Sequence, residues 1–334
     1  MGGDSSLPIV CLERGTAMTT KVINKKPAQA AKRKKIWRVL WDQKYLMLMS
    51  IPVLLYVLFF NYYPLWGWRY AFQNLNLNNL KKGADWIGFD NFTWLFNRPE
   101  FINSIRNTLA MSTINLIVGT IASIVLAILL NEVRNKAFKR TVQTVTYLPH
   151  FLSMVIVVGM AQNMFLSDGP INSMLIATKL VDSPVYWLGE GKYFWFLVAI
   201  INVWKEVGWN SIIYISTMTS IDPTLYEAAA IDGAGRFKRI LHVTLPGIKS
   251  TFMVLLIMNI GHLMEAGFEI QYLMGNDLNI DFSQTIDVFV MKYGISAGNY
   301  GRAIASGMFK SVVGIILLFG ANFLAKKLDE DTLL

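Results

Sequence analysis

Hydrophobic positions along the chain gather into six long runs separated by polar segments. An α-helix that crosses a lipid bilayer needs about 20 mostly apolar residues. Each run is long enough, and soluble cores rarely contain so many runs of this length. The pattern therefore predicts an all-α membrane protein with six transmembrane helices. The expected spans are residues 45–66, 108–130, 142–166, 194–219, 251–274 and 304–325.

Composition supports this interpretation, because 54% of the 334 residues are hydrophobic and only 16% are charged. Soluble domains carry about 25% charged residues. The one cysteine, Cys11, excludes a disulfide framework and a cysteine metal site. Residues 1–17 are expected to be unstructured, with Met18 as an alternative start, and the first apolar run begins too late for a cleavable signal peptide.

Lysine and arginine are concentrated before the first run, after the second and fourth runs, and after the last. Such segments face the cytoplasm, so both termini are expected there. The net charge of +9 then reflects topology and contact with lipid headgroups, and a nucleic-acid partner is not expected. The expected organisation is a basic tail (1–44), a first helix (45–66), an external loop (67–107), a five-helix core (108–328) containing a polar cytoplasmic loop (222–248), and a short cytoplasmic tail (329–334).

The external loop is rich in aromatic residues, as in "NYYPLWGWRYAF" (61–72) and "DWIGFDNFTWLF" (85–96). Aromatic side chains at a membrane edge commonly form an interfacial belt. They also suit a docking surface for an external partner. Both interpretations remain open from the pattern alone.

The polar loop 222–248 predicts an elbow of two short helices. Asp222 suits the N-cap and Pro223 the first helical position. Gly233 is placed to end the first helix, because glycine tolerates the left-handed conformation. Phe237 begins the apolar face of the second helix, which continues with Ile240 and Leu241. Such an elbow either rests on lipid headgroups or meets another protein.

The segment "EAAAIDGAG" followed by Leu245 and Pro246 resembles the EAA motif of ABC importer permease subunits. One departure is Ser250, where many members have a second proline. The resemblance implies that the elbow is a coupling helix that inserts into a separate ATPase subunit and transmits its movement. The implied coupling residues are Glu227, Ala228, Ala229, Asp232, Gly233, Ala234 and, as a charged neighbour, Arg236.

Residues 129–153, 204–235 and 307–328 resemble one branch of these permeases, the oligosaccharide importers related to maltose permeases. Within it the chain is most similar to importers of alginate- or pectin-derived fragments. The resemblance implies a multi-pass protein of the cytoplasmic (inner) membrane that works by alternating access. The implied partners are a second related permease, two ATPase subunits that hold ATP and Mg, and an extracytoplasmic solute-binding protein.

Charged and polar residues interrupt the fourth and fifth runs in two stripes at helical spacing. A charge inside a membrane is costly unless it faces protein or water, so the stripes predict a hydrated sugar path. The alternative is ion pairing between helices, for example Lys205 with Glu265, and both remain open. Two glutamates, Glu265 and Glu269, oppose an acidic sugar unless they are paired or protonated. The expected path residues are Asn202, Trp204, Lys205, Glu206, Trp209, Asn210, Asn259, His262, Glu265 and Glu269.

No motif for catalysis or ATP binding is present in the sequence. There is no H-E-x-x-H pair and no G-x-x-x-x-G-K-[ST] loop, and the three histidines are too scattered for zinc. The chain is therefore expected to bind no cofactor and to receive its energy from a partner. Two rivals are an ion-gradient-driven secondary transporter with a glutamate proton relay, and a membrane-embedded enzyme. The identity, length and charge of the sugar stay open.

Overall fold

The computed structural model describes residues 41–80, 83–328 and 331–332. The predicted cytoplasmic tails over 1–44 and 329–334 therefore lie largely outside the described residues. Within the described ranges the chain is helical, and its only strand-like pairing is an isolated antiparallel bridge between Gln73 and Trp86. The expected all-α class is confirmed.

The chain divides into two units, Met1–Leu65 and Trp66–Leu334. The first contains α2 (Lys44–Val57), which carries Pro52 and has no side chain buried within the chain. It continues through the π-helix η1 (Leu58–Tyr62) into the 3-10 helix η2 (Tyr63–Phe72). Such an apolar, unburied helix suits a lipid or protein environment around it.

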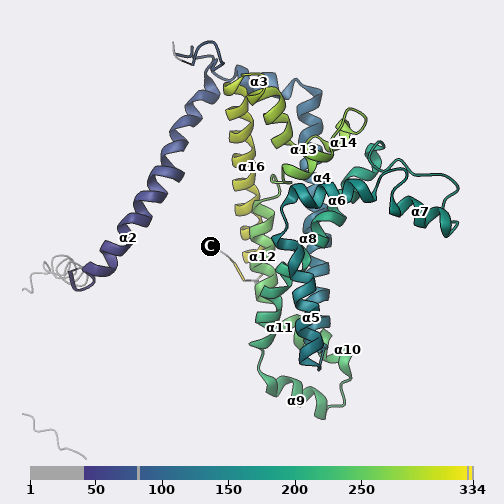
Figure 1. Cartoon of the computed structure of the whole chain (residues 1–334). Coiled ribbons are helices and arrows are strands. Elements are labelled where there is room, and N and C mark those ends of the chain that lie inside the picture. Colours follow the sequence, from purple (N-terminus) through teal and green to yellow (C-terminus); the bar gives the residue numbers. More distant parts are fainter. Residues whose placement is uncertain (1–40, 81–82, 329–330, 333–334) are drawn as a thin grey trace, which may run out of the picture. The chain divides into compact units, whose positions relative to one another are not determined.

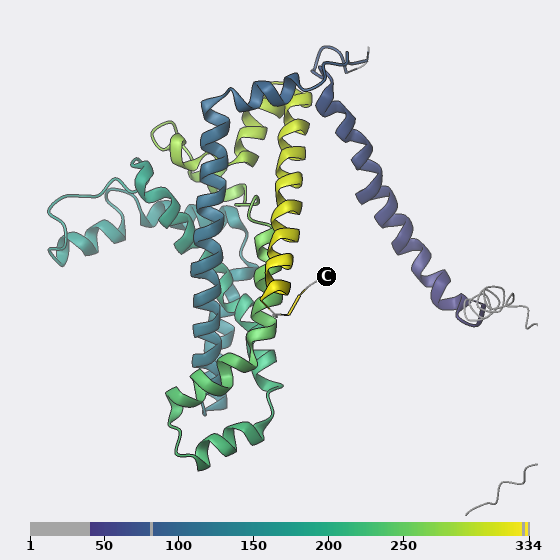
Figure 2. The same cartoon turned by 180° about the vertical axis from the view of Figure 1, so that it is seen from behind.

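Three long helices form the frame of the second unit (Figures 1 and 2). They are α4 (Pro99–Glu132), α8 (Phe194–Thr219) and α16 (Tyr300–Lys327). The bounds of α8 coincide with the expected fourth span, whereas α4 begins at Pro99 rather than near residue 108. The short helix α3 (Asp90–Phe96) lies within the segment expected to be an external loop. Helices α4 and α8 pack side by side, and α12 (Lys249–Gly261) packs on α16.

The expected third span is not one straight helix. Its first part, α5 (Lys136–Tyr147) with η3 (Leu148–Phe151), meets α6 (Met154–Met164) at 101°. Pro149 lies within η3, and the backbone of Leu152 and Ser153 after it is extended, which ends the helix. In the described residues, Lys44–Phe72 and the three long helices are each long and apolar enough to cross a membrane. The number of candidate membrane spans rises from four to as many as six if this bent pair and a second one, Arg236–Gly247 with Lys249–Gly261, each count as one span.

The expected fifth span also differs from the prediction. It enters through a bend of 56° between Arg236–Gly247 and α12, and α12 ends at Gly261 rather than near residue 274. The chain then turns, with Gly267 in the left-handed region at φ +88°. A continuous helix cannot pass through that conformation. The segment between this turn and α16 contains four short elements: α13 (Glu269–Met274), α14 (Ile280–Ser283), α15 (Ile286–Phe289) and the π-helix η6 (Val290–Ile295).

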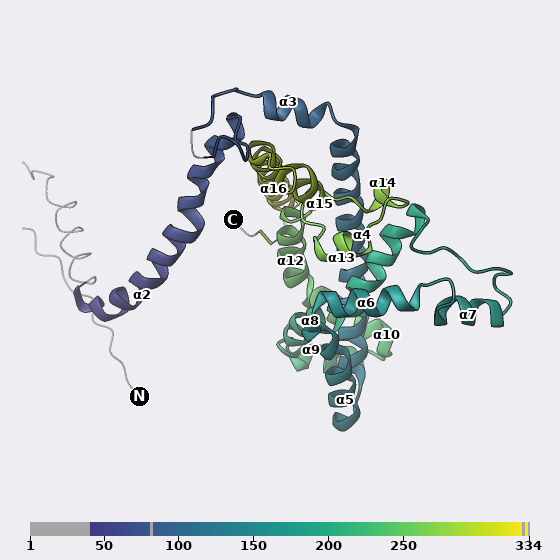
Figure 3. The same ribbon diagram turned by 45° about the horizontal axis from the view of Figure 1, so that its top comes forward.

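Buried polar side chains of α4 hold this irregular segment in place. The amide of Asn107 donates to the carbonyl oxygens of Asp281 and Gln284, both at 3.0 Å. The hydroxyl of Thr108 accepts from the backbone N–H of Ile286 at 3.0 Å. These bonds satisfy backbone groups that have no helical partner, so α13–η6 is packed against α4 as a structured part of the unit. Figure 3 shows α13, α14 and α15 together beside α4 and α16.

A side arm extends from α6 and carries α7 (Pro170–Ala177) before the chain returns through η4 (Gly191–Tyr193) to α8. The fully buried Asn172 anchors it. Its amide donates to the carbonyl oxygens of Leu166 and Val185, and its oxygen accepts from the N–H of Val185.

Candidate functional site: a polar cavity and an elbow of two short helices

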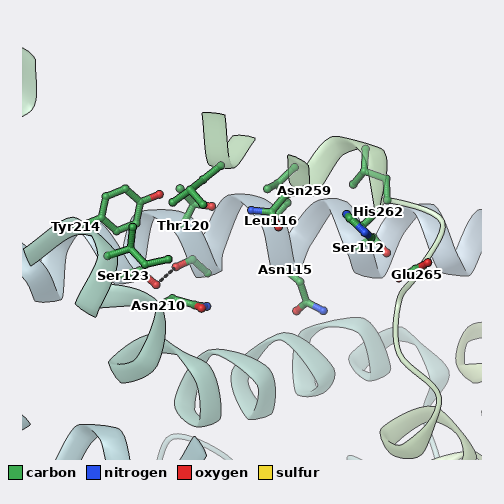
Figure 4. A pocket seen from close by; sticks show the side chains of 14 residues that line it. Ser112, Asn115, Leu116, Thr120, Ser123, Asn210, Tyr214, Asn259, His262 and Glu265 are labelled. Atoms are coloured by element: carbon green, nitrogen blue, oxygen red, sulfur yellow. Dashed lines mark hydrogen bonds between the residues drawn. The ribbon is translucent and has the colours of Figure 1, made fainter. Parts of the chain in front are cut away.

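A polar cavity lies between α4, α8 and the end of α12 (Figure 4). Its volume is ≈ 310 Å³. Hydroxyl and amide side chains predominate among its polar groups, and it contains one histidine and one carboxylate. Such groups can exchange hydrogen bonds with the hydroxyls of a polar solute. The lining residues are Ser112, Asn115, Leu116, Gly119, Thr120, Ser123, Asn210, Ile213, Tyr214, Leu255, Asn259, His262, Leu263 and Glu265.

Helix α4 supplies one wall of the cavity, which the sequence analysis did not anticipate. Ser112 and Asn115 are one turn apart, and Thr120 and Ser123 continue the same face. The hydroxyl of Ser112 and the Oδ1 atom of Asn115 are buried and have no hydrogen-bond partner among the described residues. A buried polar atom without a partner costs about 1–3 kcal/mol, so these two atoms indicate a site for a polar ligand or water.

Four of the ten expected path residues line this cavity: Asn210, Asn259, His262 and Glu265. Asn210 comes from α8 and Asn259 from the end of α12, and His262 and Glu265 follow α12. The second stripe is not a helical face, because α12 ends at Gly261 and His262 follows as its C-cap. Glu269 begins α13 and does not line the cavity, so its predicted place in the stripe is wrong.

Three other expected path residues form a separate cluster on α8. Lys205 is buried, and its ammonium donates to the backbone carbonyl of His150 at 2.7 Å and to Glu206 at 3.2 Å. The other oxygen of Glu206 lies 2.7 Å from Nδ1 of His150. The ring of Trp209 stacks on that of His150, with centroids 4.3 Å apart. These contacts join α8 to the bend after α5.

The suggested ion pair between Lys205 and Glu265 is therefore not formed, because Lys205 pairs with its neighbour in sequence. Lys205 and Glu206 contact His150 instead, Lys205 through the backbone carbonyl and Glu206 through the ring. Asn202 is half-buried and Trp204 is exposed, and neither lines the cavity. The two stripes thus separate into a cavity wall and a joint between helices.

The elbow has the local structure expected from its sequence. Helix α9 (Pro223–Ile231) begins after Asp222, whose carboxylate accepts from the backbone N–H of Thr224 at 2.9 Å. This hydrogen bond holds the pKa of Asp222 below its usual value. Gly233 has φ +73°, and the N–H of Ala234 closes the helix on the carbonyl of Ala229 at 2.8 Å. The helix end thus depends on a residue that can adopt positive φ.

The second part of the elbow comprises α10 (Arg236–Arg239), the π-helix η5 (Ile240–Thr244) and α11 (Leu245–Gly247). A hydrogen bond of 3.0 Å between the hydroxyls of Tyr226 and Thr244 ties the two arms together. Phe237, expected on the apolar face of the second helix, is 89% exposed, and Ile231 is 87% exposed. The elbow lies at the end of the second unit opposite α3 and α14 (Figures 1 and 2).

Most of the expected coupling residues lie on the surface of this elbow. Ala229 and Ala234 are half-buried beside the turn. The others, Glu227, Ala228, Asp232, Gly233 and Arg236, are exposed. Among the described residues no group of three or more histidine, cysteine, aspartate or glutamate side chains is arranged to hold a metal ion.

Known proteins similar to this chain include permease proteins of transport systems. The chain is 43% identical to Protein LplB of Bacillus subtilis over 87% of this chain and 91% of that protein. It is 42% identical to the polygalacturonan/rhamnogalacturonan transport system permease protein YteP of the same organism, over 90% of this chain and 93% of that protein.

The fold is similar to that of two solved structures. One is of a bacterial ABC transporter involved in the import of the acidic polysaccharide alginate, with a TM-score of 0.79 and 35% identity over 88% of this chain and 99% of that one. The other is of a bacterial alginate ABC transporter in complex with an alginate pentasaccharide-bound periplasmic protein, with a TM-score of 0.80 and 34% identity over 90% and 100%.

These similarities confirm the resemblance inferred from the elbow motif and the six-helix permease fold. They also exclude the embedded-enzyme interpretation, because the family consists of transport subunits. The family model that matches covers residues 119–330, which include α8, the elbow, α12 and α16. The chain belongs to the family of binding-protein-dependent transport system inner membrane components, the permease subunits of ABC transporters.

Proposed function

We propose that this chain is a permease subunit of an ATP-driven importer that takes up oligosaccharides containing uronic acids, such as fragments of pectin or alginate. The observation that carries the proposal is the extensive similarity to YteP and to the alginate transporter, which covers about nine-tenths of the chain in each case. The names of both relatives refer to acidic polysaccharides, polygalacturonan and rhamnogalacturonan for YteP and alginate for the transporter.

The cavity between α4, α8 and α12 is the part of this chain best suited to the sugar path. Sugars offer many hydroxyls, and Asn210 and Asn259 each offer both a donor and an acceptor. The unpartnered Ser112 and Asn115 atoms favour a ligand that brings its own hydrogen-bonding groups. His262 and Glu265 are exposed at the same cavity, so they remain available to a solute or to a second permease across the path.

The elbow is the proposed contact with an ATPase subunit. Its exposed Glu227 and Arg236 offer charges of both signs, and Phe237 offers an apolar anchor. Phe237 and Ile231 are both almost fully exposed, and a protein partner at the elbow would bury these apolar side chains. Two ATPase subunits would bind ATP and Mg, and this chain would bind neither.

The complete assembly in this proposal has four further components. They are a second related permease, two ATPase subunits and an extracytoplasmic binding protein that delivers the sugar. The assembly lies in the cytoplasmic membrane with the elbow and both termini on the cytoplasmic side. ATP-driven closure of the ATPase pair would move the elbow, and α8 and α12, which flank the elbow in sequence, would open the cavity outward.

The test is uptake by proteoliposomes that contain the whole assembly. Uptake of labelled oligogalacturonates or alginate oligosaccharides is expected to require ATP, the ATPase subunits and the binding protein. An imposed proton or sodium gradient without ATP is expected to drive none. Uptake driven by such a gradient in the absence of ATPase subunits would establish the secondary-transporter rival, and preference for neutral oligosaccharides would overturn the assignment to uronates.

A further inference from the structure

A second polar cavity lies in the irregular segment between α12 and α16, and the proposed function does not use it. Its volume is ≈ 270 Å³, and α13, α14 and η6 form its walls. No residue lines both this cavity and the one between α4, α8 and α12. Figures 1 and 3 show α13 and α14 on the part of the second unit remote from the elbow helix α9.

The walls combine an aromatic ring with amide and hydroxyl groups. Tyr272 is 53% exposed at this cavity, and its ring stacks on Phe268 with centroids 4.9 Å apart. Two amides, Asn276 and Gln284, and the hydroxyl of Ser283 are further lining groups. An aromatic face for C–H groups beside hydrogen-bonding amides for hydroxyls is the chemistry that suits a sugar ring.

The floor of the cavity contains acceptors that lack partners. Gln271 and Gln284 are both more than nine-tenths buried, and each has an Oε1 atom without a hydrogen-bond partner among the described residues. Their Nε2 groups are already engaged, with Ala266 and Glu100 respectively. Gln271 lies in α13 and Gln284 directly follows α14, so the two acceptors come from different walls of the cavity. An unsatisfied buried acceptor destabilises the empty state, which favours a ligand whose hydroxyls donate.

Charge distinguishes this cavity from the first. The exposed Lys292 lines it, whereas the first cavity has no lysine or arginine in its wall. The exposed Asp277 is also present, and its carboxylate can accept from sugar hydroxyls. The Lys292 ammonium provides a partner for the carboxylate of a uronic acid, which the glutamate of the first cavity does not.

We infer that this cavity is a second sugar-binding subsite that holds one uronic acid ring of the oligosaccharide before it enters the cavity between α4, α8 and α12. The inference rests on the proposed function. The volume of this cavity is slightly below the range of about 300–1,000 Å³ that is typical of pockets for drug-sized ligands. This size suits one sugar ring rather than a whole oligosaccharide. Tyr272 stacks on the ring, Lys292 pairs with the carboxylate, and Asp277 accepts from hydroxyls.

The experiment measures binding of two sugars to the complete transporter in nanodiscs without the binding protein. The probes are tetragalacturonate and the neutral maltotetraose. The variants are Tyr272→Ala and Lys292→Gln, with Tyr186→Ala and Lys179→Gln as matched controls, because both control side chains are exposed and neither lines a described cavity. Size-exclusion profiles of all four variants check that the complex stays assembled.

Y272A is expected to weaken binding of tetragalacturonate by about tenfold, the effect of losing one good contact. K292Q is expected to weaken tetragalacturonate binding to a similar extent while leaving maltotetraose unchanged. Both control variants are expected to bind as the wild type does. Loss of binding for both sugars in K292Q would show that the lysine only supports the fold, and this would overturn its assignment to the uronate.

Three outcomes overturn the subsite itself. They are no binding by the wild-type complex, unchanged binding in Y272A and K292Q, or weakened docking of the sugar-free binding protein in these variants, which would assign the cavity to a protein partner. ATP-dependent uptake by the wild-type assembly is measured in parallel. If that uptake persists while the subsite test fails, only the subsite is wrong; if uptake itself fails, the proposed function is wrong.

Discussion

The buried ammonium of Lys205 donates a hydrogen bond of 2.7 Å to the backbone carbonyl oxygen of His150. This carbonyl belongs to η3, at the bend between α5 and α6, where the helical hydrogen-bond ladder stops. Glu206 completes the joint by contacting both Lys205 and the His150 ring. The bend is thus fastened to α8, the helix that leads directly into the elbow.

Removing the ammonium should loosen this joint. Lys205→Met keeps an unbranched apolar side chain but removes the donor to the His150 carbonyl and to the Oε1 atom of Glu206, whose Oε2 atom still contacts the His150 ring. We expect the free energy of unfolding to fall by roughly 2–3 kcal/mol, because breaking a buried charged contact leaves its partners unsatisfied. The measurement is thermal unfolding of the purified transporter complex in detergent.

Lys192→Met is the matched control for this substitution. Its ammonium also pairs with a glutamate, Glu190, but both side chains are largely exposed. Solvent screens an exposed pair and it contributes little to stability, so little change is expected. Equal shifts of the melting temperature in the two variants would show that the Lys205 contacts stabilise the complex no more than an exposed ion pair does.

Close packing at Gly208 should be equally important for the same joint. A Cβ atom at Gly208 would lie 2.0 Å from the carbonyl oxygen of Thr146 in α5, which no small adjustment relieves. Gly208→Ala is therefore expected to displace α5 from α8 at a cost of about 1–3 kcal/mol or more. The readout is the melting temperature of the complex together with cross-linking between cysteines placed on α5 and α8.

Gly320→Ala provides the comparison, because this helical glycine of α16 has open space where the Cβ would stand. Alanine is favoured over glycine in a helix by about 1 kcal/mol, so G320A is expected to be neutral or slightly stabilising. If G208A proved as stable as G320A, the packing of α5 on α8 would be looser than the structure has it.

Local chemistry explains which parts of this fold the sequence predicts. The bounds of α8 follow from an apolar run with clear ends, and the elbow follows from Asp222, Pro223 and Gly233, each of which acts within a few residues of itself. These determinants do not depend on the rest of the chain. The bounds of α8 and the elbow can therefore be predicted from the sequence alone.

The break after α12 and the joint at His150 depend on contacts between distant segments. His150 and Glu206 are 56 positions apart, so no local pattern links them. A helical stripe through Glu269 assumes a continuous helix, which Gly267 at φ +88° prevents. The polar wall of α4 was missed for another reason: Ser112 and Thr120 are small and do not interrupt a hydrophobic run, although their spacing along one face was visible.

Two asparagines on α8 test whether the first cavity is the sugar path. Both Asn202 and Asn210 were expected on it, but only Asn210 lines the cavity. Asn210→Leu is expected to raise the KM for oligosaccharide uptake by about tenfold through the loss of hydrogen bonds to the sugar. Asn202→Leu, the same change two turns away, is expected to leave KM near the wild-type value. A reversed order would place the path on another face of α8.

The turn at Gly233 should control coupling to the ATPase. Its φ of +73° is open to glycine and asparagine, whereas alanine there costs roughly 1–2 kcal/mol. No atom lies near its missing Cβ, so the penalty comes from the backbone alone. Gly233→Ala is expected to reduce sugar-stimulated ATPase activity, Gly233→Asn to retain it, and Gly233→Pro to abolish it because proline fixes a negative φ.

Gly235→Ala is the matched control for the turn, since Gly235 has φ −69° and open space around it. It is expected to behave as the wild type. Normal sugar-stimulated ATPase activity in Gly233→Pro, with the chain still inserted and assembled, would contradict the role of the elbow as the element that receives movement from the ATPase.

The N-cap of α9 should make the elbow sensitive to acid. Ionised Asp222 accepts from the N–H of Thr224, and this hydrogen bond holds the pKa of Asp222 below the usual value of 3.8. The folded elbow therefore favours the carboxylate. Its contribution to helix stability is complete above pH 3.8 and is lost as the pH falls through the lower pKa of the folded state. Hydrogen exchange of the α9 amides, corrected for intrinsic rates, should show protection falling only in that acidic range.

Asp222→Asn separates the cap from its charge. Asparagine is an N-cap of comparable strength whose side-chain oxygen accepts the same hydrogen bond without titrating. The variant is therefore expected to keep protection of α9 at neutral pH and to lose the acid-dependent step. If the step persisted unchanged in D222N, another group would be responsible for it, because no carboxylate would remain at the cap to take up the proton.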